Sequence, residues 1–116
     1  MLNFTGSLNV YVATAATDLR KSFNGLFAAT TQVLQEDPRS GALFVFSNRR
    51  HNRVKTLYWD GTGLWVMTKR LEKGTFSWPK GVDVKNGKLS LSPEALGLLL
   101  DGVDLKSGSL RPWYQR

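Results

Sequence analysis

Cysteine is absent from this sequence of 116 residues, and histidine occurs once, as His51. Without cysteine the chain can form no disulfide, no thiol nucleophile and no zinc site with cysteine ligands. No apolar run approaches the ~20 residues that a membrane-spanning helix requires. The N-terminal stretch MLNFTGSLNVYV also lacks the basic start, the continuous apolar block and the small-residue cleavage site of a secretory signal. We therefore expect a soluble, cytoplasmic protein.

Acidic residues are scarce relative to basic ones. The chain has 16 Lys and Arg residues against 9 Asp and Glu residues, a formal net charge of +7. A positive charge of this size attracts polyanions over long distances, and nucleic acid is the first such partner to consider. A membrane surface is disfavoured as a partner because the basic residues do not lie along an amphipathic helix.

Hydrophobic spacing predicts two helices in a single domain, residues 1–116. Apolar residues recur on one helical face over residues 18–35, and Thr17 or Asp18 would supply the N-cap oxygen of this long helix. Ser92-Pro93-Glu94 offers an N-cap, a first-turn proline and a first-turn acid for a short helix that ends near Gly102.

Segments rich in β-branched and aromatic residues alternate with turn residues, which predicts strands. These segments are LNVYV (8–12), ALFVFS (42–47), VKTLYWD (54–60), LWVMTKRL (64–71) and FSWP (76–79). Asn86-Gly87 within VDVKNGKLSLS is typical of the type I′ turn of a hairpin. We expect an α+β fold in which one long and one short helix pack on one face of an antiparallel meander of five to six strands. Residues 105–116 would form a C-terminal arm, either docked or mobile.

Basic residues are concentrated between positions 49 and 73. This stretch contains seven of them and only two acids, Asp60 and Glu72. In a meander, the turn NRRHN and the strand end KRLEK would emerge at the same edge of the sheet. Phosphates would relieve the resulting repulsion by replacing small counterions. The alternative is a solvated loop whose charges only prevent edge pairing. The expected nucleic-acid contacts here are Arg49, Arg50, Arg53, Lys55, Lys69, Arg70 and Lys73.

A second basic site is expected at the start of the long helix, where Arg20 and Lys21 lie off its apolar face. Cations are unfavourable at a helix N-terminus unless an anion binds there. The alternative is that Asp18 offsets these charges locally.

Aromatic residues are interleaved with the cations. Trp59, Trp65 and Trp78 are candidates for stacking on unpaired bases if their rings are exposed. The alternative is that they belong to the core, where large aromatic side chains are commonly found.

Residues for catalysis are not grouped in the sequence. Asp18, Asp60 and Glu72 are scattered, and the first two already suit a helix cap and a turn. The pattern GTGLW lacks the rest of a phosphate-cradling loop. We expect no catalytic residue, no metal site and no cofactor.

Three stretches together resemble a known family: TDLRKSFNGL (17–26), GALFVFSNRRHNRVKTLYWDGTGLWVMTKRLEKGTFSWP (41–79) and LSPEALGLLLDGVD (91–104). They are similar to TnpB, the accessory protein of bacterial transposable elements of the insertion sequence 66 family. The resemblance covers nearly the whole chain. It implies a protein that is encoded beside the element's separate transposase and takes part in moving the element.

The primary hypothesis is a non-catalytic, DNA-binding accessory protein of transposition. The second is a protein-interaction module that docks on the transposase through exposed aromatic and arginine side chains. The third is a metal-dependent nuclease that uses Asp60 with Glu72 or Asp18.

Overall fold

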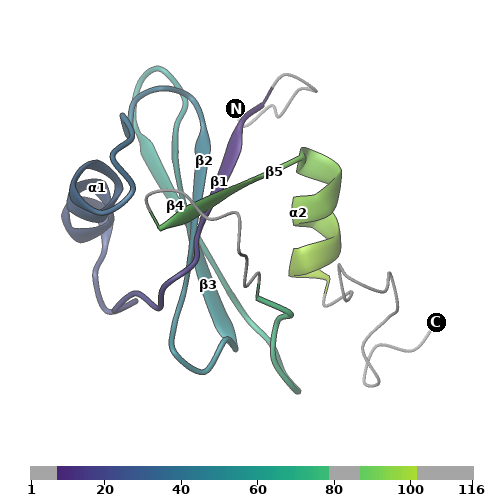
Figure 1. Ribbon diagram of the computed structural model, residues 1–116. Coiled ribbons are helices and arrows are strands. Elements are labelled where there is room, and N and C mark those ends of the chain that lie inside the picture. Colours follow the sequence, from purple (N-terminus) through teal and green to yellow (C-terminus); the bar gives the residue numbers. More distant parts are fainter. Residues whose placement is uncertain (1–7, 79–86, 102–116) are drawn as a thin grey trace.

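The computed structural model describes residues 8–78 and 87–101 (Figure 1). They form a five-stranded sheet with strand order β4-β3-β2-β1-β5 and two helices. The elements are β1 (Val10–Ala13), α1 (Phe23–Gln32), β2 (Leu43–Ser47), β3 (Arg53–Trp59), β4 (Leu64–Arg70), β5 (Lys88–Leu91) and α2 (Pro93–Leu100). The predicted α+β class, the strand number and the pair of helices, one longer than the other, are confirmed.

The sheet is mixed, whereas the sequence predicted a purely antiparallel one. Strands β1 and β2 run parallel, with Val10 opposite Leu43 and Val12 opposite Val45. The other three pairs, β1–β5, β2–β3 and β3–β4, are antiparallel. Parallel neighbours need a long crossover connection, usually a helix, and α1 lies between β1 and β2 in the chain. A meander with only short turns could not contain this helix.

The helices cover opposite faces of the sheet, so the expectation that both lie on one face was wrong (Figure 1). Helix α1 packs on the face that carries Phe44 and Phe46. Helix α2 packs on the face that carries Leu43 and Val45. Side chains along a strand alternate between faces, and all five residues of β2 are buried. Both faces of β2 are therefore apolar and both need a cover.

Helix α1 begins at Phe23, five residues later than predicted. Asp18 instead closes a turn before it, where its Oδ1 accepts a hydrogen bond from the backbone N–H of Arg20 at 3.0 Å. Such local side-chain bonds compete with helix formation. The N-cap is Ser22, whose side chain makes no capping hydrogen bond, so Thr17 and Asp18 were wrong as N-caps. The short helix α2 has the predicted cap, since the Ser92 hydroxyl accepts a hydrogen bond from the N–H of Ala95 at 3.1 Å.

The turn between β3 and β4 is organised by Asp60. Its Oδ1 accepts hydrogen bonds from the N–H groups of Thr62 at 2.9 Å and Gly63 at 3.0 Å. Its Oδ2 accepts one from the indole Nε1 of Trp65 at 2.8 Å. The bond from Trp65, followed by those from Thr62, holds the pKa of Asp60 well below its usual range. This agrees with the predicted turn role of Asp-Gly at this position.

Residues 76–78 are not a strand, although FSWP was predicted as one. Phe76 and Trp78 are nevertheless core residues on the α2 face. The Trp78 indole donates to the carbonyl oxygen of Ala13 at 2.9 Å, so a side chain satisfies this backbone group. The first arm of the predicted hairpin at Asn86-Gly87 and the arm 105–116 lie outside the described residues. In the described part of the chain, neither helix is long and apolar enough to span a membrane.

Because α2 buries only one of its faces, two neighbouring leucines of this helix should contribute very differently to the stability of the protein. Leu99 is fully buried against the sheet, whereas Leu98 is 45% exposed. We expect Leu99→Ala to lower the free energy of unfolding by about 2–5 kcal/mol. Leu98→Ala is the matched control and should change it by less than about 0.5 kcal/mol. Urea unfolding followed by circular dichroism measures both, and equal effects would contradict the packing of α2 on this face.

Candidate nucleic-acid interface

A hollow of about 630 Å³ opens on the α1 face of the sheet, beside the start of β3 and the end of β4. We call it the basic hollow, because four of its lining residues are cations and one is an acid. It is lined by Ala16, Thr17, Asp18, Leu19, Arg20, Asn48, Arg49, Arg53, Lys55 and Thr68. Sequence reasoning treated Arg20 and the hairpin cations as two separate sites, whereas they line the same hollow.

Strand register places two arginines side by side at the hollow. Arg53 and Arg70 are directly opposite each other in the β3–β4 pair, and Lys55 is opposite Thr68. Opposite residues share a face, so all four project on the α1 side. Like charges in this position destabilise a sheet. Among residues 8–78 and 87–101 the ion pairs are Arg20–Asp18 and Lys88–Glu36, so no described carboxylate neutralises the arginine pair.

The turn between β2 and β3 is shaped by Asn48 and carries Arg49 and Arg50 at its exposed tip. The Asn48 Oδ1 accepts hydrogen bonds from the backbone N–H groups of Asn52 and Arg53, both at 3.1 Å. The N–H of Leu71 donates to the Asn52 carbonyl oxygen at 2.9 Å. The turn and the end of β4 therefore meet at one edge, as predicted. Sequence reasoning missed Asn48, although its Asx-turn preference was a usable signal.

His51 anchors the same turn on the opposite, α2 face. It has a positive φ of 56°, and its Nδ1 lies 3.0 Å from the hydroxyl oxygen of Ser47. Its ring stacks on Trp78 with 5.7 Å between centroids. The N–H of Phe76 donates to the His51 carbonyl oxygen at 2.7 Å. His51 is thus a structural residue of the turn.

Lys55 links the sheet to the segment that precedes α1. It is half-buried, and its Nζ donates to the backbone carbonyl oxygen of Lys21 at 3.1 Å. The position of Lys21 depends on Gly25. A Cβ atom at residue 25 would lie only 2.6 Å from the Cβ of Lys21. The stem of Lys21 therefore crosses the first turn of α1 where only glycine leaves room. Lys21 itself is exposed and does not line the hollow.

Asp18 partly neutralises Arg20. The Arg20 guanidinium donates to both carboxylate oxygens of Asp18, at 3.0 and 2.9 Å. These hydrogen bonds lower the pKa of Asp18 to about 2, so the carboxylate stays ionised at neutral pH. The arginine side chain remains 91% exposed. For Arg20, therefore, Asp18 offsets the positive charge locally, which was the alternative considered from the sequence.

Five of the nine predicted contacts are outside the lining of the hollow, namely Lys21, Arg50, Lys69, Arg70 and Lys73. Arg70 lies next to the hollow, opposite Arg53. Lys69 points to the α2 face, where its Nζ donates to the carbonyl oxygen of Leu100 at 2.8 Å. Arg50 is exposed at the turn tip, and Lys73 is exposed just after β4, both outside the lining.

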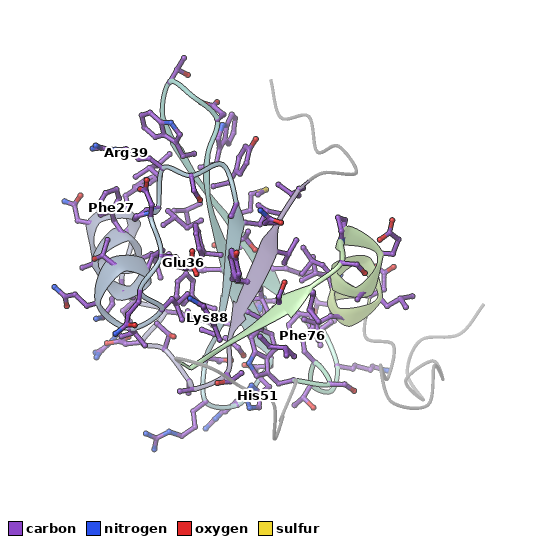
Figure 2. All side chains as sticks on the ribbon, turned by 45° about the horizontal axis from the view of Figure 1, so that its top comes forward. Phe27, Glu36, Arg39, His51, Phe76 and Lys88 are labelled. Atoms are coloured by element: carbon purple, nitrogen blue, oxygen red, sulfur yellow. The ribbon has the colours of Figure 1, made fainter. Side chains whose placement is uncertain are left out.

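None of the three tryptophans lines the hollow. Trp78 is only 7% exposed, so its ring is not open to a base. Trp59 is half-buried, and the guanidinium of Arg39 lies 5.5 Å from its ring centroid. Figure 2 shows Arg39 with Phe27 at the end of the molecule away from His51. Trp65 is 42% exposed, but it projects on the α2 face with its indole bound to Asp60.

The acids do not gather into a metal site in the part of the chain that the structure describes. Residues 8–78 and 87–101 hold no group of three or more histidine, aspartate or glutamate side chains that could bind a metal ion. Both carboxylate oxygens of Asp60 accept hydrogen bonds within its own turn. Those of Asp18 are bound by Arg20.

Gly25 and Gly97 make a matched pair for testing the contact between Lys21 and α1. We expect Gly25→Ala to lower the melting temperature, because the new Cβ would displace Lys21 and the carbonyl oxygen that Lys55 binds. Gly97 lies within α2, where a Cβ would meet no atom within 4 Å. Gly97→Ala should therefore stabilise the protein by about 0.5–1 kcal/mol. Thermal melts of both variants check this, and stabilisation by Gly25→Ala would refute the crowding at this site.

Comparison with known proteins agrees with the sequence resemblance. The model of the family described as IS66 Orf2 like protein matches residues 8–109. Uncharacterized protein y4jC of Sinorhizobium fredii is 41% identical over 104 residues, covering 90% of this chain and 86% of the relative. Uncharacterized protein y4hO of the same organism is 38% identical over 104 residues, covering 90% and 88%. No solved structure is significantly similar.

Proposed function

The chain belongs to the family of IS66 Orf2-like proteins, which are associated with transposition, and from this premise we propose that it is a non-catalytic, DNA-binding accessory protein. The observation that carries the proposal is the Arg53–Arg70 pair on one face of the β3–β4 hairpin, beside the basic hollow. Two like charges fixed opposite each other cost stability in the free protein. A bound phosphate relieves this repulsion and releases small counterions.

In this proposal, the cations differ in how directly they contact DNA. Arg53 and Arg70 hold a phosphate between them, and Lys55 supplies charge from within the hollow. Arg49 and Arg20 add positive charge to the lining of the hollow. The exposed cations Arg50, Lys73 and Lys21 contribute long-range attraction.

Base-specific recognition is not part of the proposal. Its contacts are made by charged side chains to phosphates, and such contacts position a protein on DNA without reading its sequence.

Neutralising the arginine pair should reduce the salt dependence of binding. For the double variant Arg53→Gln and Arg70→Gln we expect weaker binding and a salt slope smaller by about 1, because the pair holds one phosphate and each phosphate contact on duplex DNA adds about 0.9 to that slope. Fluorescence anisotropy with labelled DNA at several salt concentrations measures it. A slope equal to that of the unaltered protein would reject the pair as a phosphate site.

Two control variants sharpen this experiment. Lys69→Gln removes one positive charge from the opposite face and should leave the slope unchanged. Asp18→Asn removes the single acid of the lining and should tighten binding, since Arg20 would lose its neutralising partner. Variants that all behave alike would indicate that only the net charge of the protein matters.

A second candidate function is docking on the transposase of the same element. The observation that favours it is an apolar groove of about 330 Å³ between α2 and strands β3 and β4, with Met67, Leu96 and Leu100 in its walls. An apolar segment of the transposase would fill this groove and bury its surface.

Gly97→Glu tests the docking function. It places a carboxylate on the wall of the groove where a side chain has room. We expect this variant to lose co-purification with the transposase and to keep DNA binding. Undiminished co-purification would exclude the groove as the docking site.

A further inference from the structure

The basic hollow is a recess and not a convex ridge, and its shape limits what can enter it. Its lining combines sheet residues, Arg53, Lys55 and Thr68, with residues 16–20 and the turn at Asn48 and Arg49. Among the sheet residues, Lys55 is half-buried, whereas Arg53 and Thr68 are exposed. The volume of about 630 Å³ lies within the range of pockets that enclose drug-sized ligands. A short length of one nucleic-acid strand is of that size.

Resting on the proposed function, we propose that this hollow takes the sugar–phosphate backbone of single-stranded DNA in preference to duplex DNA. Lys55 is the residue that discriminates. It is half-buried, and its Nζ is held by the carbonyl oxygen of Lys21, so its charge is presented inside the recess.

A duplex cannot bring a phosphate to Lys55 as readily as a single strand can. Duplex phosphates lie on the outside of a wide, stiff cylinder, whose grooves are about 6 and 12 Å wide. Such a surface reaches exposed cations such as Arg49, Arg53 and Arg70, whereas the half-buried Lys55 is harder for it to reach. A single strand is narrow and flexible, and positively charged grooves are the usual way in which proteins follow its backbone.

The chemistry of the lining favours contacts to backbone over contacts to bases. The apolar side chains are Ala16 and Leu19, which offer no stacking surface but fit against a sugar ring. The hydroxyls of Thr17 and Thr68 are able to donate to phosphate oxygens. The side chain of Asn48 is held by the turn, since its Oδ1 accepts from the N–H groups of Asn52 and Arg53 and its Nδ2 donates to Asn52 at 2.7 Å. Affinity for a single strand should therefore be independent of its base sequence.

The test compares a labelled DNA strand of about 20 nucleotides with the blunt duplex of the same sequence, by fluorescence anisotropy between about 50 and 200 mM salt. We expect the full-length protein to bind the single strand about tenfold more tightly. Lys55→Gln should remove most of this preference, because it should weaken single-strand binding about tenfold and duplex binding clearly less. Arg50→Gln, at the turn tip outside the lining, is the control and should affect both DNA forms equally.

A second variant protects the test against a folding defect in Lys55→Gln. Thr68 is exposed on edge strand β4, so Thr68→Glu adds a carboxylate to the lining of the hollow while the bond from Lys55 to Lys21 remains. It should cause the same selective loss of single-strand binding, with an unchanged circular dichroism spectrum.

The outcomes separate this inference from the function on which it rests. Salt-dependent binding with equal or higher affinity for the duplex would overturn the single-strand preference and leave phosphate binding intact. Equal losses for both DNA forms in the Lys55 and Thr68 variants would do the same. The absence of salt-dependent binding to either form would overturn both proposals.

Discussion

Strand β2 is apolar on both faces, and the rest of the structure depends on covering both. All five of its side chains are buried, with Phe44 and Phe46 on one side and Leu43 and Val45 on the other. Water must be excluded from each face, and each receives one helix. The chain achieves this with a parallel β1–β2 pair whose crossover is α1, and with α2 after β5 (Figure 1).

The same crossover creates the basic hollow. Because α1 must cross the face that carries Phe44, the residues that precede it pass over that face beside β3. There the segment meets Arg53 and Lys55, which point to the same side by strand alternation. The bond from Lys55 to the Lys21 carbonyl oxygen ties the two together. Covering the core and assembling the cations are thus consequences of one connection.

Several structural residues near the hollow have charged or polar side chains that resemble functional ones. Asp60 binds its own turn and the Trp65 indole, which explains its low pKa without any catalytic duty. His51 packs on Trp78 and holds the β2–β3 turn in shape. The arginine pair of the hairpin, like Arg49 and Arg50 at the turn tip, is exposed and forms no ion pair within residues 8–78 and 87–101. The pair differs from those residues because strand register places its two members directly opposite each other. This distinction supports the assignment of phosphate binding to that pair.

The sequence by itself determined the α+β class, the strands of the hairpin, the cap of α2 and the clustering of cations, because these depend on local propensity, alternation and spacing. Only the tertiary structure decided the parallel pairing of β1 with β2, since pairing between distant strands is set by the burial of both faces. The tertiary structure also decided that Lys69 lies on the α2 face and that Trp78 is buried. It placed Arg20 in the same hollow as the hairpin cations Arg49, Arg53 and Lys55. Local patterns carry no information about which residues from different segments share a face, because that depends on packing between elements far apart in the chain.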